Sequence, residues 1–175
     1  MSVNIEIKAK CNHISKIKDK LENLPVQFLG KDEQEDIFFK TPAGRLKLRS
    51  SSLSGHFLIA YLREYKTGPK ISRYSLIAVK NIETVKELLA NILGVKVIVS
   101  KIREIYLYEN VRIHLDWVKN LGTFIEFEAV ANKNTTYDTE YQKINFLMQF
   151  LGIDKLDLIE GAYADILERN NAQDE

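Results

Sequence analysis

Apolar and polar residues alternate along several short segments of the chain, beginning at its third residue. In the first segment, residues 3–10, the apolar set is Val3, Ile5, Ile7 and Ala9 and the polar set is Asn4, Glu6, Lys8 and Lys10. The same period of two returns at 45–49, 112–116 and 124–128. Successive side chains of a strand point to opposite faces, so each segment is expected to be a strand with one charged face.

About eight strands are expected from these and similar segments, at residues 2–10, 34–40, 44–50, 56–65, 72–80, 96–108, 111–117 and 122–131. Three segments between them have helical spacing instead: 14–24, which stops at Pro25, 82–93, with Asn81 as its cap and Gly94 at its end, and 138–151, followed by Gly152. A short helix is expected near 162–168.

The order of these elements predicts an α+β fold, mainly antiparallel β, in which about eight strands form a closed or nearly closed tunnel-like barrel with helices packed outside. The helices would cover the apolar strand faces, so the charged faces would line the interior. A charged interior is costly unless its charges pair with one another, with water or with a ligand. The alternative is an antiparallel sheet with one solvated face, which alternates in the same manner.

Length and charge restrict the kind of protein. The 175 residues suit one domain, expected at 1–170, with a frayed polar tail at 171–175. With 25 Lys and Arg against 24 Asp and Glu, the chain lacks the bulk positive charge of a nucleic-acid-binding protein. The single cysteine, Cys11, excludes an internal disulfide, and no apolar run approaches the ~20 residues of a membrane span. We predict a cytoplasmic protein with no nucleic-acid or membrane partner, for which a homodimer is compatible with the sequence.

The motifs, in their order along the chain, resemble the CYTH family. This family is also called the triphosphate tunnel metalloenzymes, and it includes class IV adenylyl cyclases, thiamine triphosphatases and inorganic triphosphatases. The resemblance spans nearly the whole chain and is carried by Asn4 to Lys8, Gln34 to Phe39, Gly44 to Arg49, Tyr61 to Arg63, Gly68 to Tyr74, Lys101 to Arg103, Leu115 to Val118, Leu121 to Glu128, and Tyr163 to Asp165.

The resemblance implies a site for a triphosphate or nucleotide with Mg²⁺ or Mn²⁺, because phosphates need basic donors and these metals prefer carboxylate oxygens. The implied metal ligands are Glu6, Asp116, Glu126 and Glu128. The implied substrate-binding residues are Lys8, Lys47, Arg49, Arg63, Lys70, Arg73, Lys101 and Arg103, of which Lys8, Arg63 and Arg103 are the catalytic candidates. Without the resemblance, solvated carboxylates and an exposed basic strand would explain most of these positions.

Two departures from the family pattern concern the metal. Asn4 stands where family members typically begin with a glutamate, and Tyr74 and Ser75 stand where many relatives place another.

His114 and Asp116 share a strand face and offer a chelating pair, although a lone histidine in a sheet more often packs or forms hydrogen bonds. The chain has neither an HExxH pair nor a second cysteine, so nothing favours zinc. The aromatic residues Tyr106, Tyr108 and Trp117 are expected in the outer core.

Three functions remain open at this level. The leading hypothesis is metal-dependent hydrolysis of a triphosphate-containing substrate, namely inorganic triphosphate, thiamine triphosphate or a nucleoside triphosphate. The alternatives are a class IV-type adenylyl cyclase, which forms cyclic AMP and pyrophosphate from ATP, and a non-catalytic nucleotide or polyphosphate binder in which Asn4 marks lost metal chemistry.

Overall fold

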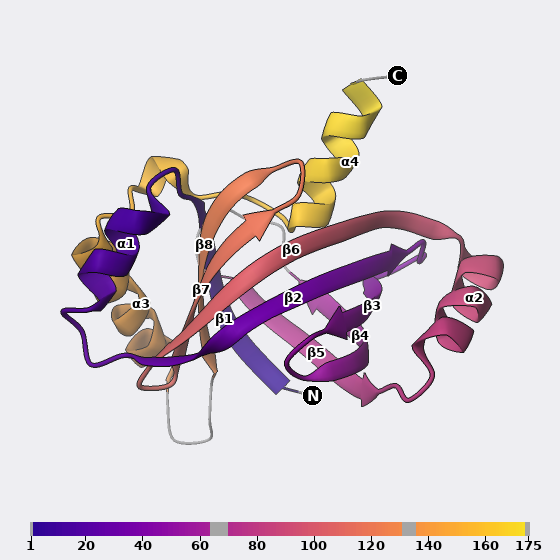
Figure 1. Cartoon of the computed structure of the whole chain (residues 1–175), viewed down its shortest axis with the longest axis horizontal. Coiled ribbons are helices and arrows are strands. Elements are labelled where there is room, and N and C mark those ends of the chain that lie inside the picture. The colour runs from indigo at the N-terminus through magenta and orange to yellow at the C-terminus, as the bar shows by residue number, and fades with distance from the viewer. Residues whose placement is uncertain (1, 64–69, 131–135, 174–175) are drawn as a thin grey trace.

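The computed structural model describes residues 2–63, 70–130 and 136–173, and for Ser2, Val3, Arg63, Lys70, Ser72 and Gln173 it describes the backbone alone. Within this part of the chain, eight strands form a closed antiparallel barrel in the order β1-β5-β4-β3-β2-β6-β7-β8, with β8 pairing back to β1 (Figure 1). The strands are β1 (Ser2–Lys10), β2 (Gln27–Phe39), β3 (Arg45–Ser51), β4 (Gly55–Arg63), β5 (Lys70–Ala78), β6 (Val95–Tyr108), β7 (Val111–Val118) and β8 (Gly122–Val130). The predicted barrel is confirmed.

Two long strands, β2 and β6, carry much of the curvature. They pair along almost their whole length, from Gln27 opposite Leu107 to Phe39 opposite Val95. The register shifts at two points, between Phe28 and Gly30 and between Phe38 and Phe39. Such irregularities bend a strand and increase its twist, which helps a sheet to close on itself.

The helices pack on the outside of the barrel. The α-helices are α1 (Ile14–Leu21), α2 (Ile82–Leu93), α3 (Tyr137–Leu151) and α4 (Tyr163–Gln173), and Lys155–Asp157 forms a short 3₁₀ helix. Figure 1 shows α1 and α3 together at one end of the barrel, α2 at the opposite end and α4 standing above β6. Asn81 and Thr136 cap α2 and α3 as side-chain acceptors, and Gly152 ends α3 in a left-handed conformation.

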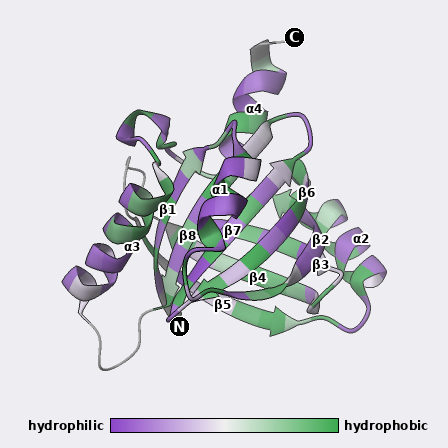
Figure 2. Cartoon of the chain, turned by 60° about the vertical axis from the view of Figure 1, so that its left-hand side comes forward, coloured by the Kyte–Doolittle hydropathy of each residue, from purple (hydrophilic) through white to green (hydrophobic). Residues whose placement is uncertain are grey.

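The main core lies between the barrel wall and the α1–α3 pair. It consists of the buried outward-facing residues of β1, β7 and β8 and the apolar stripes of the two helices: Ile5, Ile7, Ile113, Leu115, Ile125, Phe127, Ile14, Ile17, Leu21, Ile144 and Leu147. Green and purple residues alternate along the strands in Figure 2, as this division requires. Apolar side chains therefore face the helices, and the charged faces turn into the barrel, as predicted.

Some element boundaries differ from the expectation. β2 begins at Gln27, seven residues before the expected start at 34. The sequence does not reveal this longer strand, because both of its faces are polar: Lys31, Glu33 and Glu35 face solvent, and the alternate residues face the lumen. The last helix continues to Gln173, beyond the expected 162–168. Tyr106, Tyr108 and Trp117 pack against the main core, as expected. Among the described helices, none has the length and apolarity needed to span a bilayer.

Candidate functional site

A cavity of about 410 Å³ occupies the barrel lumen. Inward-facing residues of all eight strands line it, together with the first residues of α4. Its walls differ in chemistry: β4 and β5 contribute Ile59, Tyr61, Tyr74 and Leu76, whereas the other strands contribute most of the charged side chains. The lumen therefore offers a charged wall facing a wall of apolar and aromatic side chains.

Three cations converge on one carboxylate in this lumen. The guanidinium of Arg49 holds Asp36 in two hydrogen bonds, Nε to Oδ1 at 2.7 Å and Nη2 to Oδ2 at 2.7 Å. The Nζ atoms of Lys47 and Lys101 reach Oδ2 of the same carboxylate at 3.0 and 3.1 Å. In the described part of the chain no second carboxylate forms an ion pair with these three residues. We call Asp36, Lys47, Arg49 and Lys101 the basic cluster; it carries an excess of positive charge.

The pKa values of the basic cluster reflect this excess. Burial disfavours the charged form of Asp36, but Arg49, Lys101 and Lys47 together hold its pKa well below the usual range. Burial, followed by the charge of Arg49, lowers the pKa of Lys47 to about 7. Burial likewise lowers the pKa of Lys101 to about 8, although Asp36 opposes the change. The lysines are held next to other cations with too little negative charge to stabilise them fully.

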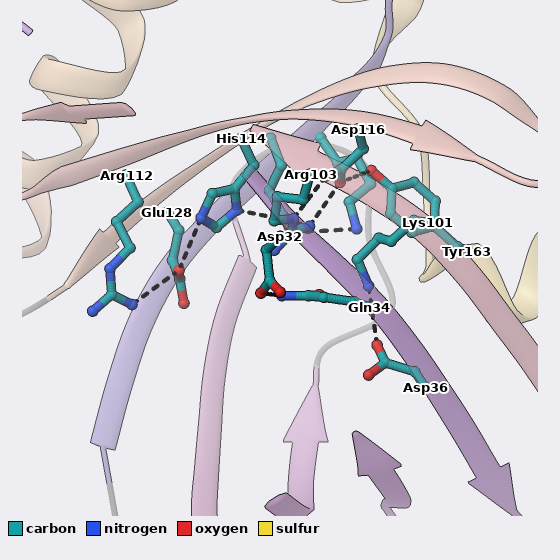
Figure 3. A network of polar contacts seen from close by, with 12 residues as sticks. Asp32, Gln34, Asp36, Lys101, Arg103, Arg112, His114, Asp116, Glu128 and Tyr163 are labelled. Carbon is teal, nitrogen blue, oxygen red and sulfur yellow. Dashed lines mark hydrogen bonds and ion pairs between the residues drawn. The ribbon is translucent and has the colours of Figure 1, made fainter. Parts of the chain in front are cut away.

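Arg103 organises a second cluster, from β6 across β7 to β8 (Figure 3). It binds Asp116 through two hydrogen bonds of 2.6 and 2.7 Å and Glu126 through one of 2.7 Å. Lys8 lies 3.3 Å from the other oxygen of Glu126, with its Nζ 3.8 Å from the centre of the Tyr163 ring. Burial works against the charged form of Arg103, but Asp116 and Glu126 raise its pKa well above the ordinary value. The guanidinium is thus a permanent cation, fixed in orientation at the lumen wall.

The carboxylates of Glu6 and Glu128 make up a third group. They face each other in register on β1 and β8, and both line the cavity. Glu128 accepts a hydrogen bond from Nδ2 of Asn4 and lies 3.4 Å from Arg112 and 3.9 Å from Nε2 of His114. The amide oxygen of Asn4 is buried without a hydrogen-bond partner.

These oxygens fit a hard divalent cation. Two carboxylates facing each other across a strand pair repel, and a cation between them would remove that repulsion. The unpartnered amide oxygen of Asn4 adds a neutral ligand of the kind that Mg²⁺ accepts. Within the described residues, no three or more His, Cys, Asp or Glu side chains already converge on a single point as metal ligands.

Most of the predicted site residues that the structure describes meet in the lumen. The cavity is lined by Glu6, Lys8, Lys47, Arg49, Lys101, Arg103, Glu126 and Glu128. The side chains of Arg63 and Lys70 lie outside the described residues; their backbones belong to β4 and β5.

Two predicted residues lie elsewhere. Arg73 is exposed and does not line the cavity, because Tyr74 and Leu76 of the same strand point inward and alternate residues face opposite sides. Asp116 is fully buried behind the lumen wall, where its oxygens accept hydrogen bonds from Arg103 and, at 2.6 Å, from the hydroxyl of Tyr163. In this position Asp116 orients Arg103 and does not face the metal group.

Several residues of the site have no role that could be predicted from the sequence. Asp36 is the most important of them, followed by Asp32 and Gln34 on the same strand and by Tyr163 at the start of α4. The spacing of Asp32, Gln34 and Asp36 at every second position was the available signal, but the charged residues between them obscured it. Tyr163 stood in a quoted motif, with nothing to indicate that it reaches Asp116.

Comparison with known proteins agrees with this architecture. The family model described as "CYTH domain" matches residues 2–163. A Methanocaldococcus jannaschii protein named "Putative adenylate cyclase MJ0240" is 27% identical over 177 residues, covering 94% of this chain and 98% of the relative. The solved structure of PH1012 from Pyrococcus horikoshii OT3 is 27% identical, with a TM-score of 0.78 and coverage of 94% of this chain and 98% of that one.

A more distant solved structure shares the fold. It is the Hippeastrum protein HpAC1, described as a "putative adenylyl cyclase" with a dominant triphosphatase activity. Its chain is 15% identical to the present one, with a TM-score of 0.69 and coverage of 98% and 96% of the two chains.

Proposed function

Because the chain belongs to the CYTH domain family, we propose that it is a metal-dependent enzyme that hydrolyses a triphosphate-containing substrate in the barrel lumen. The observation that carries this proposal is the convergence of Lys47, Arg49 and Lys101 on Asp36. Of these cations Lys101 is buried and the other two are partly buried, and with one carboxylate between them they are short of negative charge, which a polyphosphate chain supplies. Inorganic triphosphate, thiamine triphosphate and nucleoside triphosphates are the candidate substrates.

The residues of the lumen would have separate roles in this hydrolysis. Lys47, Arg49 and Lys101 bind phosphate oxygens and hold the chain of phosphates in line. Arg103, which Asp116 fixes in orientation, and Lys8, which lies next to Glu126, would neutralise charge that develops as the phosphoryl group is transferred. Because their positions are set before the substrate arrives, little reorganisation is needed in the transition state.

Glu6 and Glu128, together with the amide oxygen of Asn4, would hold Mg²⁺ or Mn²⁺. The metal, when bound, neutralises phosphate charge and orients the phosphate oxygens. Glu126 shares its oxygens with Lys8 and Arg103, so it would join the ligands only after phosphate replaces it at one of these cations. Since Asn4 supplies an oxygen without a charge, metal affinity should be lower than with a carboxylate at this position.

A second function is favoured by one observation, the apolar wall of the lumen. Ile59, Tyr61, Tyr74 and Leu76 offer surface against which a nucleobase could pack. With ATP held so that its ribose 3′-hydroxyl attacks the α-phosphorus, pyrophosphate would leave and cyclic AMP would form. The name of the Methanocaldococcus jannaschii relative agrees with this adenylyl cyclase alternative.

Incubation of the protein with tripolyphosphate, thiamine triphosphate and ATP, each with Mg²⁺ and with Mn²⁺, tests the proposal. Release of phosphate supports hydrolysis, and cyclic AMP with pyrophosphate supports the cyclase. Arg49→Ala should abolish either activity, whereas Arg169→Ala, which removes an exposed arginine from α4, should not. Binding of these compounds without any turnover would identify a non-catalytic polyphosphate binder and refute the enzymatic proposal.

A further inference from the structure

Gln34 carries a buried hydrogen-bond acceptor that the proposed roles leave unused. The residue is 7% exposed and lines the cavity, yet its amide oxygen has no hydrogen-bond partner. A buried acceptor without a partner costs free energy, so such an atom at a cavity wall indicates a donor that arrives with a ligand.

Asp32 fixes the orientation of this amide. The Nε2 atom of Gln34 donates to Oδ2 of Asp32 at 2.6 Å, which turns the carbonyl oxygen away from Asp32 (Figure 3). Asp32 is itself held by the Ser51 hydroxyl at 2.9 and 2.8 Å, the Ser52 hydroxyl at 3.1 Å and the amide N–H of Leu53 at 3.2 Å. These contacts tie Gln34 to the β3–β4 turn, so its acceptor has a fixed direction before any ligand binds.

Gln34 lies beside the basic cluster on the same strand. It lies two residues before Asp36 on the inward face of β2, a step of about 7 Å along a strand. Beyond Asp32, in the direction away from Asp36, the cavity lining includes Leu29 of this strand and Leu53 and Ser54 of the β3–β4 turn, while Arg103 lies opposite Asp32 on β6. If a phosphate chain on the basic cluster continues in this direction, its next group, the organic part of the substrate, passes Gln34 and reaches Leu29 and Leu53.

From this arrangement we infer that Gln34, positioned by Asp32, is a specificity-determining residue that accepts a hydrogen bond from the organic part of the substrate. The inference rests on the proposed function and narrows its substrate class. The preferred substrate is an organic triphosphate with an O–H or N–H donor close to its first phosphate and an apolar ring beyond it, rather than inorganic triphosphate.

Gln34→Leu removes the acceptor while keeping a side chain of similar size. Calorimetry with methylene-bridged, non-hydrolysable analogues of tripolyphosphate, methyl triphosphate and ATP in Mg²⁺ separates the phosphate part from the organic part. We expect the variant to bind the ATP analogue about 5- to 20-fold more weakly, the size of one lost hydrogen bond, and the other two ligands within about twofold of wild type. Glu35→Leu, at the next residue on the exposed outer face of β2, is the matched control and should change none of the three affinities.

Other results would overturn the inference. An equal loss for all three ligands would place Gln34 on a phosphate or on a water, and unchanged binding of all three would remove it from the site. If the variant does not fold, the wild-type protein still decides the question, since equal affinity for the methyl triphosphate and ATP analogues contradicts a donor contact. Failure of wild type to bind the tripolyphosphate analogue at all would instead refute the proposed function.

Discussion

Asp36→Asn is the most informative perturbation of the basic cluster, because it removes the carboxylate and keeps the shape of the side chain. In the protein without ligand, Lys47, Arg49 and Lys101 would then face one another with a neutral amide between them. Breaking a buried ion pair in this way costs about 3 to 5 kcal/mol. For a domain of this size, that loss corresponds to a fall in melting temperature of about 6 to 20 °C.

Triphosphate should respond in the opposite sense. In wild type the ligand must compete with Asp36 for the three cations, whereas in the variant it does not. Loss of one competing charge-assisted contact should tighten tripolyphosphate binding about tenfold or more. The variant should therefore be less stable than wild type without ligand but show a larger rise in melting temperature when tripolyphosphate is added.

Thermal melting and calorimetry on the same preparations measure both effects. Glu35→Gln is the control, since it removes a carboxylate from the exposed face of the same strand. The two effects have one cause and should appear together. If Asp36→Asn is destabilised without a gain in tripolyphosphate affinity, the basic cluster is a structural ion-pair network and not an anion site. If the variant is as stable as wild type, the three cations do not need the carboxylate, which refutes the excess of positive charge.

Four further predictions concern the other groups of the lumen. Arg49→Ala and Arg103→Ala should each weaken triphosphate binding by about 1.5 to 3 kcal/mol with the fold retained, and unchanged affinity measured by calorimetry in both variants would remove them from the site. Glu128→Gln should abolish turnover while leaving phosphate binding in place, and full activity in Mg²⁺ would contradict its role as a metal ligand. Asn4→Glu should lower the melting temperature in chelator through repulsion with Glu6 and Glu128, and should shift the Mg²⁺ activation curve to lower concentration; if neither curve moves, Asn4 does not face the metal. Burial lowers the pKa of Lys47 to about 7 and of Lys101 to about 8, so these lysines lose their protons as pH rises through that range. The affinity for triphosphate should therefore fall from pH 7 to 9, and the protein should take up protons when it binds triphosphate near pH 8. Calorimetry in buffers of different ionisation enthalpy detects that uptake, and its absence would count against the lysines as phosphate ligands.

The alternating pattern by itself determined the strands and their charged faces, and the number and order of the elements favoured a barrel. On β1, Ile5, Ile7 and Ala9 lie on one face and Asn4, Glu6 and Lys8 on the other. The same alternation recurs in other strands, and amphipathic helices are available to cover the apolar faces. Side-chain direction in a strand follows directly from position along the chain, so a barrel with a charged lumen could be predicted. The resemblance to the CYTH family, and not the alternation alone, assigned Lys47, Arg49, Lys101 and Arg103 to the site, because an exposed basic strand alternates in the same manner.

The partners of these residues were decided by the tertiary structure alone. Lys101 meets Asp36 across 65 positions of sequence because β6 pairs with β2, and Tyr163 meets Asp116 across 47 because α4 docks against the barrel. Arg73 and Asp116 were predicted to bind the ligand, and the tertiary structure places both of them away from it. A charged residue of a strand faces the ligand only if it lies on the inward face and no neighbour covers it. Here the side chain of Arg73 points to solvent, and that of Asp116 lies buried behind Arg103. The chain's local pattern specifies which way a side chain points, whereas the closed barrel specifies which charges meet, and ion pairing depends on the distances between them.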